Sequence, residues 1–170
     1  YVYGGNSAAP LAENFGGPDL TPVGVVSHPT AGALEGDQWL GTGFTQDNYF
    51  KVSPSVWPGD TQGVVSVLLE YQGVQTASDQ IWGFRNAAST RFLGVDLNPI
   101  NGNRLALNYT TIGGAPIHQQ LDSHLVNGQV YEIRCEWGAF GVSVKVNGVT
   151  LLRQPALLEL TPADLVVGWM

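Results

Sequence analysis

Cysteine is almost missing from this chain of 170 residues, which holds only Cys135. One cysteine cannot form a disulfide within the chain, so a hydrophobic core has to hold the fold together. Charge is also scarce, because Asp, Glu, Lys and Arg make up only 12% of the residues, about half the usual share. The surface must then consist largely of uncharged polar side chains, glycine and backbone. No apolar run approaches the roughly 20 residues of a membrane-spanning helix, which excludes membrane insertion by such a helix.

Basic side chains are few, with seven Lys and Arg against 14 Asp and Glu and a formal net charge of −7. The imbalance lies in residues 1–80, where Lys51 is the one basic side chain beside eight acids, whereas residues 81–170 hold six of each. Binding to a nucleic-acid backbone requires a stripe of basic side chains, and docking to an anionic membrane requires the same. We therefore exclude nucleic acid and membrane surfaces as partners.

Turn-forming residues are abundant, with 22 Gly and 10 Pro, while hydrophobic residues reach 44%. This combination disfavours a helical bundle and is typical of many short strands. One short helical turn is predicted at residues 161–164. Short runs rich in Val, Ile, Leu, Tyr and Phe predict strands at residues 20–27, 38–44, 49–57, 64–71, 80–86, 91–97, 104–111, 130–137, 142–146, 149–154 and 165–169.

Apolar and polar residues alternate along several of these segments. In residues 130–137 one side includes Ile133, Cys135 and Trp137, and the same period of two continues through residues 142–146. A period of two means that one face of a strand packs on a core while the other meets water. Two sheets of such strands, stacked on their apolar faces, form a sandwich.

Three Asn-Gly pairs separate predicted strands, at residues 101–102, 127–128 and 147–148. Both residue types tolerate positive φ angles, so the pair is typical of the tight turns that join antiparallel strands. Helical crossovers between strands are not indicated. The sequence therefore predicts an all-β, antiparallel two-sheet β-sandwich.

The expected organisation is an N-terminal arm over residues 1–19 and a single β-sandwich domain over residues 20–170. The first segment is rich in Gly and Pro without a strand period, and the total length favours one domain. The chain begins at Tyr1 without a Met and ends on a predicted strand. We therefore expect a domain released from a longer polypeptide, or equally a shortened form of one.

The order of several segments resembles the concanavalin A-like jelly-roll sandwiches, in particular the laminin-G-like modules. The segments that carry the resemblance are residues 32–40, 50–53, 130–137, 144–149 and 165–168. Together they extend over about four-fifths of the chain, from residue 30 onward. The resemblance implies sugar binding, adhesion or glycan hydrolysis, and it does not choose among these functions.

Catalytic patterns are not evident. Hydrolysis of glycosides needs two carboxyl groups about 5–9.5 Å apart, whereas Glu132 and Glu136 lie four residues apart on one face, or about 13 Å. Cys135 is on the apolar side of its strand, where a thiol is inert. The histidines, including His118 and His124, have no metal-ligand spacing and are expected in loops or at the surface. We therefore predict that the protein is not an enzyme.

A sugar-binding face is the favoured site. An aromatic side chain can stack on a sugar ring while planar polar groups hold its hydroxyls. Trp57 is the candidate platform, because alternation places it on the polar side of its strand, although it could instead pack under a loop. The predicted ligand-binding residues are Trp57, Asp60, Arg104, Asn108, Glu132 and Arg134. Asp60 follows closely after Trp57, and we expect the last four residues on one sheet face with Trp57.

Calcium is a further possibility at residues 96–103. Asp96, Asn98 and Asn101 would supply oxygen ligands of the kind that calcium prefers. The helix-loop-helix calcium pattern requires an acid at the twelfth position, where Leu107 stands. The alternative is that these side chains only form a turn. Calcium apart, no cofactor is predicted.

The sequence thus predicts a non-catalytic binding or adhesion module of a larger surface or virion assembly, with a glycan as ligand. A phage appendage would be one such assembly. A purely structural decoration or spacer subunit of a virion or fibre is the alternative, and a glycoside hydrolase-like enzyme is the third hypothesis. The expected partners are a glycan or sister chains in a homo-oligomer. The expected location is extracellular, at a cell surface or in a virion.

Overall fold

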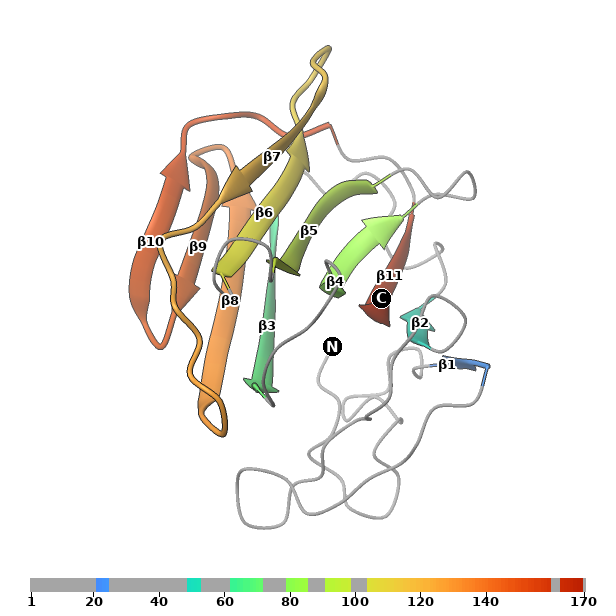
Figure 1. Ribbon diagram of the computed structural model, residues 1–170. Helices are drawn as coiled ribbons and strands as arrows, with labels where there is room; N and C mark the ends of the chain where they lie inside the picture. Colours follow the sequence, from blue (N-terminus) through green and yellow to red (C-terminus); the bar gives the residue numbers. More distant parts are fainter. Residues whose placement is uncertain are drawn as a thin grey trace.

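The structure is a computed structural model that describes residues 21–24, 49–52, 62–71, 79–85, 91–98, 104–159 and 163–169 (Figure 1). These residues form strands and connecting turns, and none of them is helical. No helix in this part of the chain could therefore span a membrane. The strands are β1 (Thr21–Val23), β2 (Tyr49–Val52), β3 (Gly63–Glu70), β4 (Asp79–Arg85), β5 (Arg91–Asn98), β6 (Arg104–Thr110), β7 (Pro116–Gln120), β8 (Val130–Gly138), β9 (Gly141–Val146), β10 (Val149–Gln154) and β11 (Asp164–Trp169).

The strands form two sheets that face each other (Figure 1). The larger sheet has seven strands in the order β1-β2-β11-β4-β5-β6-β7, and the smaller has four in the order β10-β9-β8-β3. Every pairing within the two sheets is antiparallel. The predicted all-β, antiparallel two-sheet sandwich is therefore confirmed.

The core lies between the sheets and is built from the inward residues of both. On β8, Ile133, Cys135 and Trp137 are buried as the alternation predicts. An edge-to-face ring contact joins the two sheets, because Phe84 of β4 packs on Trp137 of β8 with a centroid distance of 5.6 Å. Phe84 also packs edge-to-face on Trp82 of its own strand at 5.9 Å. Such pairs add to the stability that comes from the buried area of the rings.

The hairpin between β9 and β10 turns at residues 147–148, as the sequence predicts. Asn147 has a φ of 48° and Gly148 a φ of 79°, and Val146 pairs with Val149 across the turn. Both central residues thus have the positive φ that this tight turn requires. The pair at residues 101–102 lies outside the described residues, although the strands on either side of it, β5 and β6, do pair.

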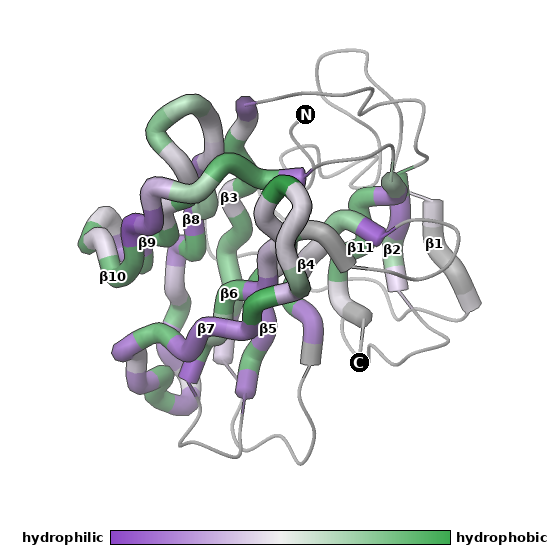
Figure 2. The backbone as a smooth tube through the Cα atoms, turned by 90° about the horizontal axis from the view of Figure 1, so that it is seen from above, coloured by the Kyte–Doolittle hydropathy of each residue, from purple (hydrophilic) through white to green (hydrophobic). Residues whose placement is uncertain are grey.

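One strand was not predicted. β7 contains Ile117 as its only aliphatic residue beside Pro116, His118 and two glutamines, and Figure 2 shows it as hydrophilic over most of its length. Because β7 has no apolar face, the alternation of apolar and polar residues does not predict this strand. The predicted arm (residues 1–19) and the predicted strand at residues 38–44 lie outside the described residues, as does the first half of the predicted helical turn at 161–164. The second half of that turn is not helical, because Asp164 begins β11.

The expectation that outward faces meet water is wrong for the middle of the large sheet. Ala106 is fully buried although it points outward from β6, and Thr110 on the same side is 7% exposed. On β5 the outward Asp96 is 4% exposed. The outer face of this sheet is therefore a buried polar surface at its centre.

Candidate functional site

The candidate site is the outer face of the seven-stranded sheet, where cross-strand pairing places polar residues side by side. Residues directly paired in antiparallel strands carry their side chains on the same face. One row of pairs runs through Lys51, Val166, Gly83, Gly94, Asn108 and His118. The adjacent row runs through Gln80, Asp96, Ala106 and Gln120. Four strands thus bring amides, a carboxylate and an imidazole onto one surface.

Three of these side chains form a hydrogen-bonded chain. Nδ2 of Asn108 donates to Oδ2 of Asp96 at 2.7 Å. Oδ1 of Asn108 accepts from Nδ1 of His118 at 2.8 Å. Asp96 is buried and His118 is exposed, so the chain leads from the interior of the face to solvent. Among the described residues, Nε2 of His118 has no hydrogen-bond partner.

Gln80 lies over two glycines of the same face. A Cβ at Gly83 would overlap its amide nitrogen, and one at Gly94 would lie 2.8 Å from it. Nε of Arg85 donates to Oε1 of Gln80 at 2.7 Å. Nε2 of Gln80 has no hydrogen-bond partner among the described residues, although it is buried. A side chain at either glycine would displace the amide, so the two glycines define this position.

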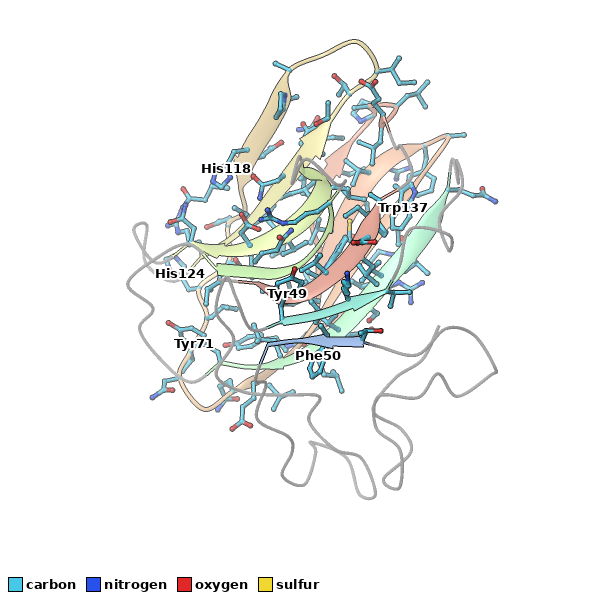
Figure 3. The ribbon with its side chains drawn as sticks, turned by 90° about the vertical axis from the view of Figure 1, so that its right-hand side faces the viewer. Tyr49, Phe50, Tyr71, His118, His124 and Trp137 are labelled. Atoms are coloured by element: carbon cyan, nitrogen blue, oxygen red, sulfur yellow. The ribbon has the colours of Figure 1, made fainter. Side chains whose placement is uncertain are left out.

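Arg104 and His124 form a second polar pair at the end of β6. Nη2 of Arg104 lies 3.1 Å from Nε2 of His124, and a guanidinium can only donate. Nε2 of His124 is therefore the acceptor. Figure 3 shows His118 and His124 on the side of the molecule away from Trp137, which belongs to the core.

Glu132 and Arg134 do not share this face, so that part of the predicted sugar-binding site is wrong. Both lie on β8, which belongs to the four-stranded sheet, and their side chains point away from the core on the opposite side of the sandwich from Arg104 and Asn108. Alternation tells the two sides of a strand apart, but it does not tell to which sheet a strand belongs. Trp57 and Asp60 lie outside the described residues.

On the outer face of the small sheet, ion pairs connect β8 with β9. Nε of Arg134 lies 2.7 Å from Oε1 of Glu136, and Nζ of Lys145 lies 3.0 Å from Oε2. These two hydrogen bonds lower the pKa of the Glu136 carboxyl, against a smaller opposing effect of desolvation. Glu132 accepts a hydrogen bond from the Ser66 hydroxyl at 3.1 Å. In this cluster the cations of Arg134 and Lys145 are therefore both paired with Glu136.

The predicted calcium ligands lie partly in a strand rather than a loop. Asp96 and Asn98 belong to β5, and Asp96 is held by Asn108. Asn101 lies outside the described residues. Within the described ranges, no group of three or more His, Cys, Asp and Glu side chains is placed to hold a metal ion. Calcium binding stays a prediction.

Cys135 is placed as expected, in the core and fully buried. Burial, with a smaller contribution from the charge of Glu136, raises the pKa of its thiol. A buried thiol of raised pKa is a poor nucleophile.

Two comparisons by sequence found nothing, since the chain matches no family of known proteins and no curated protein. Solved structures are similar in fold. An alginate lyase from Alteromonas sp. 272 matches 71% of this chain at 14% identity with a TM-score of 0.56. A polysaccharide lyase of family 18, aly-SJ02, matches 75% at 14% identity with a TM-score of 0.57. A tetrameric galectin from the ball sponge Cinachyrella sp. matches 69% of this chain and 85% of its own at 20% identity, with a TM-score of 0.48.

The chain spans only 58% and 62% of the lengths of the two lyases. These similarities establish the concanavalin A-like jelly-roll fold, as the resemblance in the sequence predicted. The prediction of a non-catalytic module that is not an enzyme is contradicted, because the similar structures include two polysaccharide lyases. A carboxylate pair or an activated nucleophile is the signature of hydrolysis, whereas cleavage by a lyase requires neither.

Proposed function

We propose that this protein is an enzyme that cleaves a uronate-containing polysaccharide by β-elimination on the polar face of the seven-stranded sheet. The observation that carries the proposal is the hydrogen-bonded chain Asp96–Asn108–His118, which presents Nε2 of an exposed imidazole as a base. The fold shared with an alginate lyase and a family 18 polysaccharide lyase supports it.

In this reaction Nε2 of His118 removes the proton from C5 of a uronate, next to the carboxylate. The electrons of the C5–H bond form a C4=C5 double bond as the bond from C4 to the glycosidic oxygen breaks. The departing oxygen takes a proton from the imidazolium or from water. A general base in such a step contributes about 10²–10⁴-fold to the rate.

Hydrogen-bond donors near His118 suit the negative charge that builds up on the uronate carboxylate. Gln120 lies two residues along β7 on the same face, about 7 Å away by strand rise, and its Nε2 has no partner among the described residues. Fixed donors that face developing charge stabilise a transition state. Arg104 lies four residues from Asn108 on β6, about 13 Å away, and suits the carboxylate of a neighbouring sugar in the same polymer.

The proposed partner is thus a polysaccharide, and the proposed place of action is outside the cell, where such polymers occur. Membership of a virion or surface assembly and formation of a homo-oligomer stay predictions. The single-domain arrangement, with residues 1–19 as an arm, also stays a prediction.

The test is incubation of the whole chain with alginate, with other uronate polymers and with a neutral glucan. The ultraviolet absorbance of the new double bond, which is conjugated with the carboxylate, follows the reaction. We expect cleavage of a uronate polymer and a loss of about 10²–10⁴-fold in His118→Gln. Arg153→Gln, at an exposed position on β10 of the other sheet, should retain full activity as the control.

Three results would overturn the proposal. The first is release of reducing ends without the double bond, which would indicate hydrolysis. The second is an unchanged rate in His118→Gln. The third is failure of the folded protein to cleave any uronate polymer.

A further inference from the structure

We infer that Asp96 is a positioning residue that sets the tautomer of His118 by fixing the amide orientation of Asn108. The role in catalysis rests on the proposed function, whereas the tautomer is a property of the chain itself. The two can therefore be tested apart.

The first step is the contact between Asp96 and Asn108. In its ionised form, the carboxylate of Asp96 can only accept hydrogen bonds. The atom of Asn108 that lies 2.7 Å from Oδ2 of Asp96 must therefore be the amide nitrogen. A hydrogen bond to a charged acceptor is also stronger than one between neutral groups, so Asp96 selects one of the two orientations of the amide.

The second step is the contact between Asn108 and His118. With its nitrogen directed at Asp96, Asn108 presents its oxygen to Nδ1 of His118 at 2.8 Å. An amide oxygen has no proton to donate, so Nδ1 must carry the proton of this bond. A neutral imidazole has one N–H, and Nε2 is therefore left with its lone pair.

Without Asp96, the same pair of residues could bond the other way round. A flipped amide would donate to Nδ1, and the ring proton would then sit on Nε2. Nε2 would be a donor and no longer a base. The carboxylate thus decides whether the solvent-facing nitrogen of His118 can accept a proton.

Small residues of the face make the diagonal contact possible. Asp96 pairs directly with Ala106, and Asn108 lies two residues further along β6, directly opposite Gly94. Diagonal neighbours across a strand pair lie about 7–8 Å apart, close enough for their side chains to meet. The side chain of Ala106 is a single methyl group, and Gly94 has no side chain, with the Gln80 amide 2.8 Å from the place of a Cβ.

Long-range ¹H–¹⁵N NMR spectra of the histidine rings test the inference without any substrate. At a pH where the rings are neutral, His118 should show the Nδ1–H tautomer in the wild-type protein. In Asp96→Asn, the amide at 96 can donate or accept, so the Nε2–H tautomer should appear as well. His124 is an internal control, because its Nε2 accepts from Arg104 and its Nδ1–H tautomer should stay unchanged in both proteins.

A second variant covers the case in which Asp96→Asn does not fold. Asn108→Ala removes the acceptor of Nδ1 at a part-buried position and should also release the tautomer. Finding His118 as Nε2–H in the wild-type protein overturns the inference. So does an unchanged Nδ1–H tautomer in a folded Asp96→Asn or Asn108→Ala variant.

The effect of Asp96→Asn on kcat is tested in a separate experiment. Asp96→Asn should lower kcat by up to the 10²–10⁴-fold that a general base contributes, with KM little changed. If the tautomer shifts but kcat does not, the proposed role of His118 fails while its positioning by Asp96 stands. If kcat falls with the tautomer unchanged, the positioning role is refuted.

Discussion

Replacing Gly83 by alanine tests the placement of Gln80 on the polar face. A Cβ at position 83 would overlap the amide nitrogen of Gln80 and lie 2.9 Å from its Cδ, while the nearest backbone atom is the oxygen of Leu93 at 3.2 Å. The methyl group therefore competes chiefly with the Gln80 side chain. When Gln80 leaves this position, its 2.7 Å hydrogen bond from Arg85 is broken.

The magnitude follows from that bond. It is buried and charge-assisted, so its loss costs about 1.5–3 kcal/mol. Alanine recovers about 0.5–1 kcal/mol relative to glycine within a strand. We therefore expect Gly83→Ala to lower the free energy of unfolding by about 1–2 kcal/mol. In a Gln80→Ala background the same change should instead raise it by up to about 1 kcal/mol.

The assay is urea unfolding of the wild-type protein, the two single variants and the double variant, followed by the fluorescence of the five tryptophans. The coupling free energy between positions 80 and 83 should be about 1.5–3 kcal/mol. If Gly83→Ala has the same effect in both backgrounds, within about 0.5 kcal/mol, then Gln80 does not occupy the space over Gly83 and the reasoning is refuted.

Three further outcomes are expected. Hydrogen bonds from two cations lower the pKa of Glu136. The stability it adds should be complete above the ordinary pKa of 4.5 and lost as the pH falls through the lowered pKa, so Glu136→Gln should cost about 0.2–1 kcal/mol at neutral pH and nothing in strong acid. Cys135 should resist thiol reagents until the protein unfolds, as a time course with and without urea would reveal. Gly141→Ala should lower the melting temperature more than Gly113→Ala, because both have positive φ but a Cβ meets the backbone only at 141.

The fold could be predicted where the inward residues of a strand are apolar without interruption. β8 and β9 were predicted because Ile133, Cys135 and Val144 follow the period of two, and all three are fully buried. The turn at residues 147–148 was predicted because Asn and Gly tolerate the positive φ that its backbone adopts. β7 was not predicted, because it is held mainly by pairing with β6, and pairing between strands produces no pattern in the local sequence.

The candidate site could be predicted only in part, for the same reason. Asn108 was identified as a ligand-binding residue, but its partner His118 lies on the strand that was missed. Asp96 was predicted as a calcium ligand, and in the structure its Oδ2 accepts a hydrogen bond from Asn108. Glu132 and Arg134 are polar residues of the expected kind, but they lie on the four-stranded sheet and not on the seven-stranded one. Each of these outcomes depends on which strands pair with one another, and a single sequence does not show which strands pair.

The distribution of charge between the sheets favours an anionic substrate on the large sheet. The chain carries a net charge of −7, yet among the described side chains of the seven-stranded sheet three are basic, Lys51, Arg85 and Arg104, against the two acids Asp96 and Asp164. On the small sheet, the cations of Arg134 and Lys145 are paired with a glutamate. The described strands of the large sheet thus carry a small excess of basic residues within an acidic chain, which suits the anionic polymer proposed above as substrate.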